Sequence, residues 1–216
     1  NGDPQFMKWF SHYDQPYSPD LNSWAVLTAF QNVVHTLEDA DPSKPWLDNI
    51  NWLMLAAETS CYWYWTGQCV WDQQVTNAAN QGYSMVKSVV DVLLSAGKDR
   101  TGPTIFAPWI TPENPGGKCW GQGCLLDATR EGTVHSFVHD ISGLKRVTLV
   151  LRATTGETNI AMTDCGPYTS QTGAAITAHY FTAKLPIGAG DVRYYIEAED
   201  SKGNVSRGAL ERVYLA

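Results

Sequence analysis

The spacing of apolar residues changes near residue 100, and this change divides the chain into a helical part and a strand-forming part. Between residues 20 and 97, apolar side chains recur at steps of three and four residues, as on one face of a helix. Beyond residue 130, apolar and polar residues alternate or β-branched residues run together, as in strands. We therefore predict an α+β chain with two domains, a small α-helical bundle followed by an antiparallel β-sandwich.

Three helices are predicted in the first part, which we assign to a domain at 1–100. The first begins at the candidate N-cap Asp20 and ends at 38–42. Its apolar stripe consists of Trp24, Leu27, Phe30, Val34 and Leu37. The second has Pro45 at its first helical position. The third begins near Trp71 and ends before Gly97, a residue suited to follow a helix C-terminus.

A linker rich in Pro and Gly is predicted at 101–130, with a first short strand at 102–108. The remaining strands are predicted at 133–140, 146–152, 176–185, 193–199 and 205–216. The stretch 194–204 resembles the penultimate hairpin of immunoglobulin-like and fibronectin-type modules on bacterial extracellular enzymes. This resemblance implies an immunoglobulin-like β-sandwich over 131–216.

Four consecutive aromatic residues follow the second predicted helix. They are Tyr62, Trp63, Tyr64 and Trp65, and they come after Glu58 and Ser60. Aromatic rings stack on the apolar faces of sugars, and a nearby carboxylate binds sugar hydroxyls. Because Glu58 follows the apolar run 52–57, we expect it to be partly buried. The run 56–67 is therefore either a sugar-binding segment or a buried helix end that only packs.

The same run resembles the fifth sequence motif of family-57 glycoside hydrolases, an α-glucan-acting group that includes amylopullulanases, glucanotransferases and branching enzymes. The matching residues are Ala57, Glu58, Ser60, Trp63, Trp65 and Gly67, whereas Cys61 stands where the family usually has Asp. In that family the motif lies after the catalytic barrel and borders the active site. The catalytic carboxylates belong to earlier motifs, which nothing in this chain resembles.

The resemblance implies the C-terminal, non-catalytic portion of an exported, secreted or cell-surface glycosidase that contributes to a sugar-binding rim. The rim residues would be Glu58, Ser60, Tyr62, Trp63 and Trp65. The partners would be an α-glucan or another polysaccharide, and a catalytic barrel on a separate or cleaved chain. The alternative, favoured by Cys61, is an extracellular carbohydrate-binding or structural module without a catalytic partner. The chain begins with Asn-Gly-Asp-Pro, and we expect it to be processed or part of a longer precursor.

The five cysteines suggest two local disulfides, Cys61–Cys69 and Cys119–Cys124, because each pair brackets a short turn that contains Gly. A zinc site is the competing interpretation, but these spacings differ from the usual zinc-binding patterns. Cys165 is left over. It is either a free thiol or a link to another chain, such as the catalytic barrel.

Two tryptophans, Trp109 and Trp120, lie in the linker rich in Pro and Gly. They either form a sugar-stacking platform, for which we take Trp120 as the candidate, or fill the seam between the two parts of the chain. His135 and His139 lie four residues apart on one predicted strand, about 13 Å from each other, so we interpret them as packing residues and predict no metal site.

Charge and composition exclude several classes of function. The net charge is −7, which argues against a nucleic-acid-binding protein because phosphates require a basic surface. No apolar run reaches the 18 residues of a membrane span. No phosphate-binding loop, dinucleotide fingerprint or nucleophile elbow is present, so we predict no cofactor.

Overall fold

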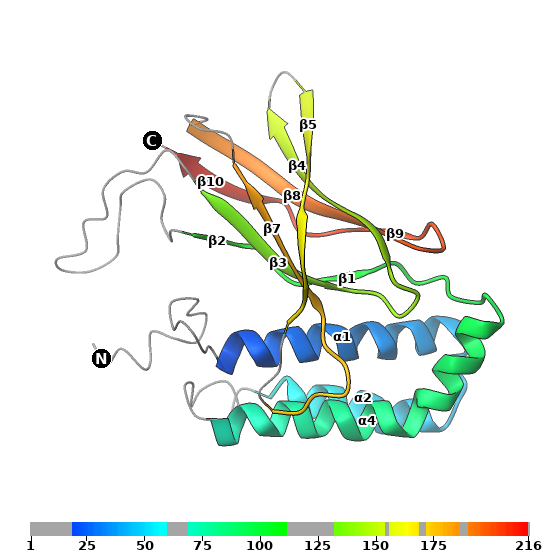
Figure 1. Cartoon of the computed structure of the whole chain (residues 1–216). Coiled ribbons are helices and arrows are strands. Elements are labelled where there is room, and N and C mark those ends of the chain that lie inside the picture. Colours follow the sequence, from blue (N-terminus) through cyan, green and yellow to red (C-terminus); the bar gives the residue numbers. More distant parts are fainter. Residues whose placement is uncertain are drawn as a thin grey trace.

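The computed structural model describes residues 19–59, 69–111, 132–153, 156–168, 172–185 and 190–215. A helical layer lies beneath two antiparallel β-sheets (Figure 1). Its helices are α1 (Pro19–Ala40), α2 (Trp46–Ala57) and α4 (Cys69–Ser95). The α+β prediction and its three helices are thus confirmed. None of the described helices is long and apolar enough to cross a membrane.

The apolar stripes of the three helices meet in one core. Its fully buried members include Val26, Phe30, Val34, Leu37, Ile50, Ala79 and Val86. Gly82 lets α4 approach α1, because a Cβ at this position would overlap the ring of Phe30. Gly97 ends α4 with φ +64°, as predicted. Pro45 is the N-cap of α2 instead of its first helical residue.

The first sheet has the order β1-β3-β7-β6, and β2 also pairs with β3. Its strands are β1 (Thr104–Ile105), β2 (Trp109–Thr111), β3 (Thr133–His139), β6 (Thr163–Pro167) and β7 (His179–Lys184). The second sheet has the order β10-β8-β4-β5, and β9 also pairs with β8. Its strands are β4 (Leu144–Ala153), β5 (Gly156–Ala161), β8 (Gly190–Asp200), β9 (Val205–Arg207) and β10 (Glu211–Leu215).

The two sheets pack face to face around a second hydrophobic core. The first sheet contributes Val134, Val138, Phe181 and Ala183, and the second contributes Val147, Leu149, Ile196 and Ala198. These residues alternate along their strands with residues on the opposite face. In β3 that opposite face is buried as well, because Phe137 packs against α1.

The sequence analysis missed β5 and β6, because these strands are mostly exposed and polar and show no alternation of apolar residues. The strand predicted at 176–185 begins only at His179, since the N–H of Ala178 donates a hydrogen bond to the carbonyl oxygen of Ala25 in α1. The last strands, predicted together over 205–216, are β9 and β10. Between them, the N–H of Gly208 bonds to the carbonyl oxygen of Ile196.

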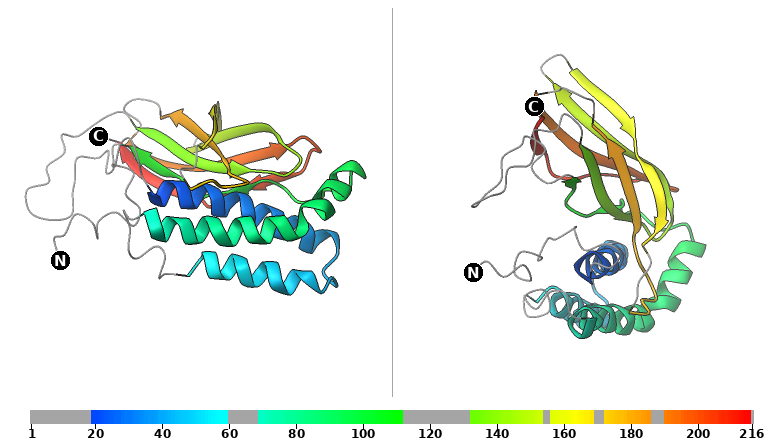
Figure 2. Two further views of the ribbon diagram at one scale, coloured as in Figure 1. Left: turned by 60° about the horizontal axis from the view of Figure 1, so that its bottom comes forward. Right: turned by 60° about the vertical axis from the view of Figure 1, so that its left-hand side comes forward.

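The helical layer contacts the first sheet through α1, which lies between the strands and the other two helices (Figure 2). Leu21 and Ala25 of α1 share a cluster with Phe137 of β3 and with Ala178. The helical and strand-forming parts therefore share an apolar interface. The predicted domain boundaries at 1–100, 101–130 and 131–216 stay a prediction.

Candidate functional site

Glu58, the first of the predicted sugar-binding residues, directly follows α2 and is exposed to solvent. Its Oε1 accepts a hydrogen bond of 2.8 Å from Nε2 of Gln31 in α1. The expectation of partial burial is therefore wrong. The physical reason is that the apolar run before Glu58 does not lie wholly inside the bundle, since Trp52 and Leu55 are 71% and 56% exposed.

The other predicted rim residues, Ser60, Tyr62, Trp63, Trp65 and Trp120, lie outside the described residues. The same holds for Cys61, Cys119 and Cys124, and for the side chain of Cys69, the first residue of α4. The two disulfide pairs therefore stay predictions. Cys165 in β6 is an exposed free thiol.

One side of α2 presents a partly apolar surface to solvent. Trp52, Leu55 and Glu58 follow one another at three-residue steps, so they lie one helical turn apart. The opposite side of the helix is held in the bundle by Leu47 and Ile50. An exposed indole ring and a carboxylate on one helix surface provide a stacking face and a hydrogen-bond acceptor.

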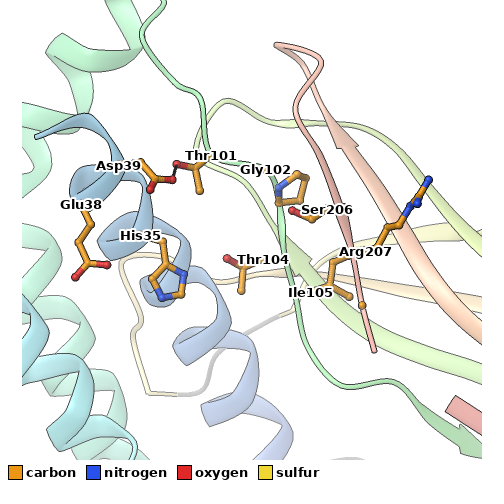
Figure 3. A pocket seen from close by; sticks show the side chains of 11 residues that line it. His35, Glu38, Asp39, Thr101, Gly102, Thr104, Ile105, Ser206 and Arg207 are labelled. Atoms are coloured by element: carbon orange, nitrogen blue, oxygen red, sulfur yellow. Dashed lines mark hydrogen bonds between the residues drawn. The ribbon is translucent and has the colours of Figure 1, made fainter. Parts of the chain in front are cut away.

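A polar pocket of about 470 Å³ begins one helical turn from Gln31 along α1, at His35. It lies between the second half of α1, the segment 101–105 and β9 (Figure 3). Its polar lining side chains are His35, Glu38, Asp39, Thr101, Thr104, Ser206 and Arg207. Among the described residues, the lining includes no Trp, Tyr or Phe.

The two acidic groups of this pocket are fixed by neighbours. Oε1 of Glu38 accepts a hydrogen bond of 2.8 Å from Nδ2 of Asn51 in α2. Oδ2 of Asp39 accepts one of 2.6 Å from the hydroxyl of Thr101. These bonds orient both carboxylates without neutralising them, so the pocket offers negatively charged hydrogen-bond acceptors beside the imidazole of His35.

Trp109 packs in the seam between helices and sheet, one of its two predicted roles. Its ring lies 5.5 Å from that of His135, nearly parallel at 16°. It meets Phe106 edge-on at 6.1 Å. Phe106 in turn lies 4.8 Å from Trp24 of α1. Trp109 thus belongs to an aromatic layer under α1.

His135 is held as a neutral ring in this layer. Its Nδ1 lies 2.6 Å from the hydroxyl of Tyr180, and its Nε2 lies 2.5 Å from the hydroxyl of Thr111. Burial lowers the pKa of His135 to about 4. Burial likewise lowers the pKa of His139 to about 4. At neutral pH these rings are uncharged packing groups, which agrees with their predicted role.

In comparisons with known proteins, no family model and no curated protein matches this chain. Solved structures do match, but distantly. The cycloalternan-degrading enzyme from Trueperella pyogenes in complex with cycloalternan is 13% identical with a TM-score of 0.32, over 39% of this chain and 13% of the enzyme. A DUF4426 family protein from Pseudomonas aeruginosa PAO1 is 12% identical with a TM-score of 0.31, over 53% of this chain and 92% of that protein.

A third match is the sulfane dehydrogenase SoxCD from Paracoccus pantotrophus, which is 14% identical with a TM-score of 0.28, over 47% of this chain and 23% of that chain. The matches thus include a carbohydrate-degrading enzyme, of which this chain covers a small share. All three are too distant to carry an argument about function. The family-57 resemblance receives no support from these comparisons.

Proposed function

We propose that this chain is a non-catalytic, glucan-binding portion of an exported α-glucan-acting glycoside hydrolase. The observation that carries the proposal is the placement of Glu58. Its carboxylate is exposed, is held by Gln31 at 2.8 Å, and lies at the start of the motif-like run 57–67. A carboxylate fixed in this way accepts hydrogen bonds from sugar hydroxyls without first having to lose conformational freedom.

The surroundings of Glu58 suit a neutral sugar chain. Trp52 and Leu55 give apolar surface on the same helix, and the pocket that begins at His35 gives polar groups one turn away on α1. Sugar rings need both kinds of contact, because their ring faces are apolar and their rims carry hydroxyls. We place the glucan along α2, with Glu58 at the end level with Gln31. Trp52 is level with the pocket, because its neighbour Asn51 bonds to the pocket residue Glu38.

The non-catalytic assignment follows from the chemistry of glycoside hydrolysis, which requires two carboxyl groups on either side of one bond. In the described part of the chain, the acids nearest in sequence to Gln31 on α1 are Glu38 and Asp39. They lie seven and eight residues beyond Gln31, which is about 10–12 Å along the helix axis and more than the roughly 5–9.5 Å between the two carboxyl groups of glycosidases. We assign the catalytic pair to a barrel on another segment or chain.

We also propose that the sandwich is an immunoglobulin-like module that packs against the helical layer and stabilises it. The order β1-β3-β7-β6 corresponds to strands A, B, E and D of such folds. The order β4-β8-β10 corresponds to strands C, F and G, with β5 as an added edge strand. This correspondence of strand order supports the fold assignment and carries no function of its own.

Titration calorimetry of the full chain with maltoheptaose tests the glucan-binding proposal. We expect measurable binding that Glu58→Gln weakens about tenfold, the size of one hydrogen bond to a charged group. Glu157→Gln is the matched control, because Glu157 is an exposed glutamate on β5, in the sandwich. No binding by the unchanged chain, or equal binding by both variants, contradicts the proposal.

The non-catalytic assignment has its own test, which is incubation of the chain alone with starch. We expect no release of reducing sugar. Hydrolysis by this chain that Glu58→Gln abolishes would show instead that the chain is itself the enzyme.

A further inference from the structure

Three aspartates from three separate segments converge where the helical layer meets both sheets. Asp99 lies between α4 and β1, Asp140 follows β3 of the first sheet, and Asp200 is the last residue of β8 in the second. One carboxylate oxygen from each lies within 4.8 Å of the other two. All three side chains are buried, with at most 5% of their surface exposed.

This cluster of negative charge has no compensating cation among the described side chains. Within the described ranges, none of the three carboxylates forms a salt bridge. Oδ2 of Asp99 and Oδ2 of Asp140 are buried without a hydrogen-bond partner. Buried polar atoms are almost always paired, and an unpaired buried charge is costly.

The other oxygens of the cluster are fixed by turns. Oδ1 of Asp140 accepts hydrogen bonds from the N–H and the hydroxyl of Ser142, at 2.8 and 2.7 Å. Oδ1 of Asp99 accepts one from the N–H of Thr101, at 3.1 Å. The turns thus provide hydrogen-bond donors for the Oδ1 atoms of Asp99 and Asp140, whereas the Oδ2 atoms of both residues have no donor.

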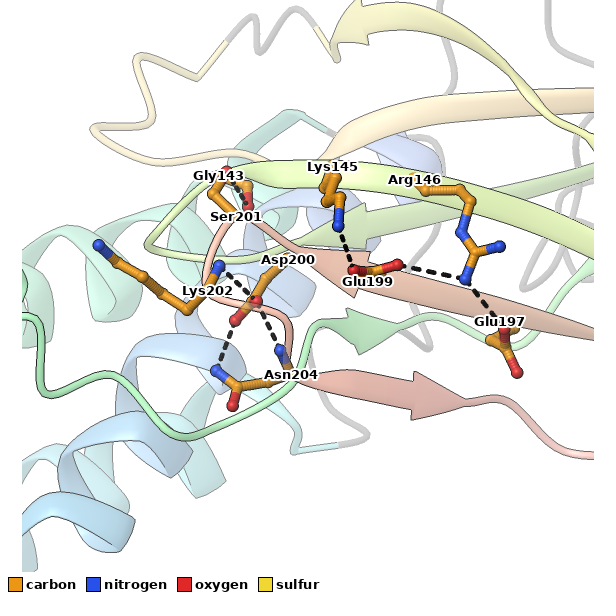
Figure 4. A network of polar contacts seen from close by, with 9 residues as sticks. All are labelled: Gly143, Lys145, Arg146, Glu197, Glu199, Asp200, Ser201, Lys202 and Asn204. Atoms are coloured by element: carbon orange, nitrogen blue, oxygen red, sulfur yellow. Dashed lines mark hydrogen bonds and ion pairs between the residues drawn. The ribbon is translucent and has the colours of Figure 1, made fainter.

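Asp200 is the most firmly held of the three (Figure 4). Its Oδ1 accepts hydrogen bonds of 2.8 Å from the N–H groups of Lys202 and Asn204. Its Oδ2 accepts one of 2.7 Å from Nδ2 of Asn204. The carboxylate is therefore held in one orientation within the cluster.

We propose that Asp99, Asp140 and Asp200 bind a Ca²⁺ ion. The donors are oxygens only, which selects a hard cation. Ligand atoms on opposite sides of one Ca²⁺ lie about 4.6–5.2 Å apart, twice the Ca–O distance, so oxygens within 4.8 Å of one another can share an ion. The ion offsets two of the three negative charges of the carboxylates and ties the segment after α4 to both sheets. It is therefore a structural ion, independent of glucan binding.

The test is thermal unfolding and calorimetry of the full chain, first freed of metal with EDTA and then given CaCl₂. We expect binding of one ion per chain. We also expect Tm to rise by about 5–10 °C when free Ca²⁺ is a hundredfold above Kd. An equal rise with MgCl₂ would overturn the choice of Ca²⁺. No binding and no rise would overturn the site.

Asp140→Asn and Asp99→Asn are the decisive variants, because each keeps the Oδ1 turn contact and replaces an unpaired oxygen by an amide. Both should lose the Ca²⁺-dependent rise in Tm and melt no lower than the unchanged chain in EDTA, because charge repulsion is relieved. Asp91→Asn, on the exposed side of α4, is the control and should keep the rise. If the aspartates serve only the turns, all three variants will respond to Ca²⁺ as the unchanged chain does, which overturns the proposal.

Discussion

Asn32 of α1 accepts, through Oδ1, a hydrogen bond of 2.9 Å from the backbone N–H of Ile141, which directly follows Asp140. Its Nδ2 also reaches the carbonyl oxygen of Gly102, at 3.4 Å. The side chain of Asn32 is fully buried. One amide group thus joins the helical layer to the loop after β3 and to the segment before β1.

Replacing the amide of Asn32 should weaken the attachment of α1 to the loop after β3 and to the segment before β1. Asn32→Ala leaves the partly buried N–H of Ile141 without the Asn32 acceptor, and we expect the free energy of unfolding in urea to fall by about 1–3 kcal/mol. Asn77→Ala is the control, because Asn77 is exposed on α4 and Ala favours a helix. Equal stability of the two variants would show that the junction does not depend on Asn32.

The close approach of α1 and α4 at Gly82 gives a second prediction. In an open helix, Gly→Ala would stabilise by roughly 1 kcal/mol. Here the new methyl group overlaps the ring of Phe30, and overpacking of a core costs about 1–3 kcal/mol. We therefore expect Gly82→Ala to lower Tm, and Phe30→Leu to relieve part of that loss in the double variant. A rise in Tm for Gly82→Ala alone would contradict the packing.

The buried His135 makes stability depend on pH. Its pKa is about 4 in the folded chain, against 6.5 in the unfolded one, so only the unfolded chain takes up a proton between these values. The contribution of His135 to the free energy of unfolding is present above pH 6.5. It falls by about 1.4 kcal/mol per pH unit between pH 6.5 and 4.

The comparison that isolates this effect is the unchanged chain against His135→Gln, by urea unfolding at several pH values. The two should differ most above pH 6.5 and converge toward pH 4. Asp140, whose pKa is raised by burial to about 7, makes the folded chain more stable as the pH falls, but this effect is the same in both proteins. A difference that stays constant over this range would mean that His135 has the same pKa in the folded and the unfolded chain.

The cysteines can be sorted by labelling the native chain with a thiol reagent. Cys165 is exposed and free, so it should react without denaturant. The other four should react only after reduction if Cys61–Cys69 and Cys119–Cys124 are disulfides. Peptide mapping without reductant checks this, and the recovery of all four as free thiols would rule both pairs out.

Local sequence patterns predicted the elements that carry a strong apolar period. The helices at 19–40, 46–57 and 69–95 and the strands around Val134, Leu149 and Ile196 were all foreseen, because each buries one face in a core. The polar strands β5 and β6 were not. A strand at a sheet edge is held by backbone hydrogen bonds, which do not require a particular pattern of apolar and polar side chains.

Sites built from distant residues escaped the sequence analysis for a different reason. Asp99, Asp140 and Asp200 each occur alone in a turn, and such an aspartate ordinarily caps a backbone N–H. They come together only in the folded chain, where the segment after α4 meets the ends of β3 and β8. In contrast, Glu58 could be proposed from the sequence, because its neighbours resemble a known motif.

Hydrogen–deuterium exchange of the full chain, with and without maltoheptaose, tests the glucan-binding account most directly. We predict slower exchange in peptides that cover 52–67 and the middle of α1 around Gln31, with no change in β5. Protection confined to the sandwich, or no protection at a maltoheptaose concentration that saturates binding, would contradict the placement of the glucan along α2.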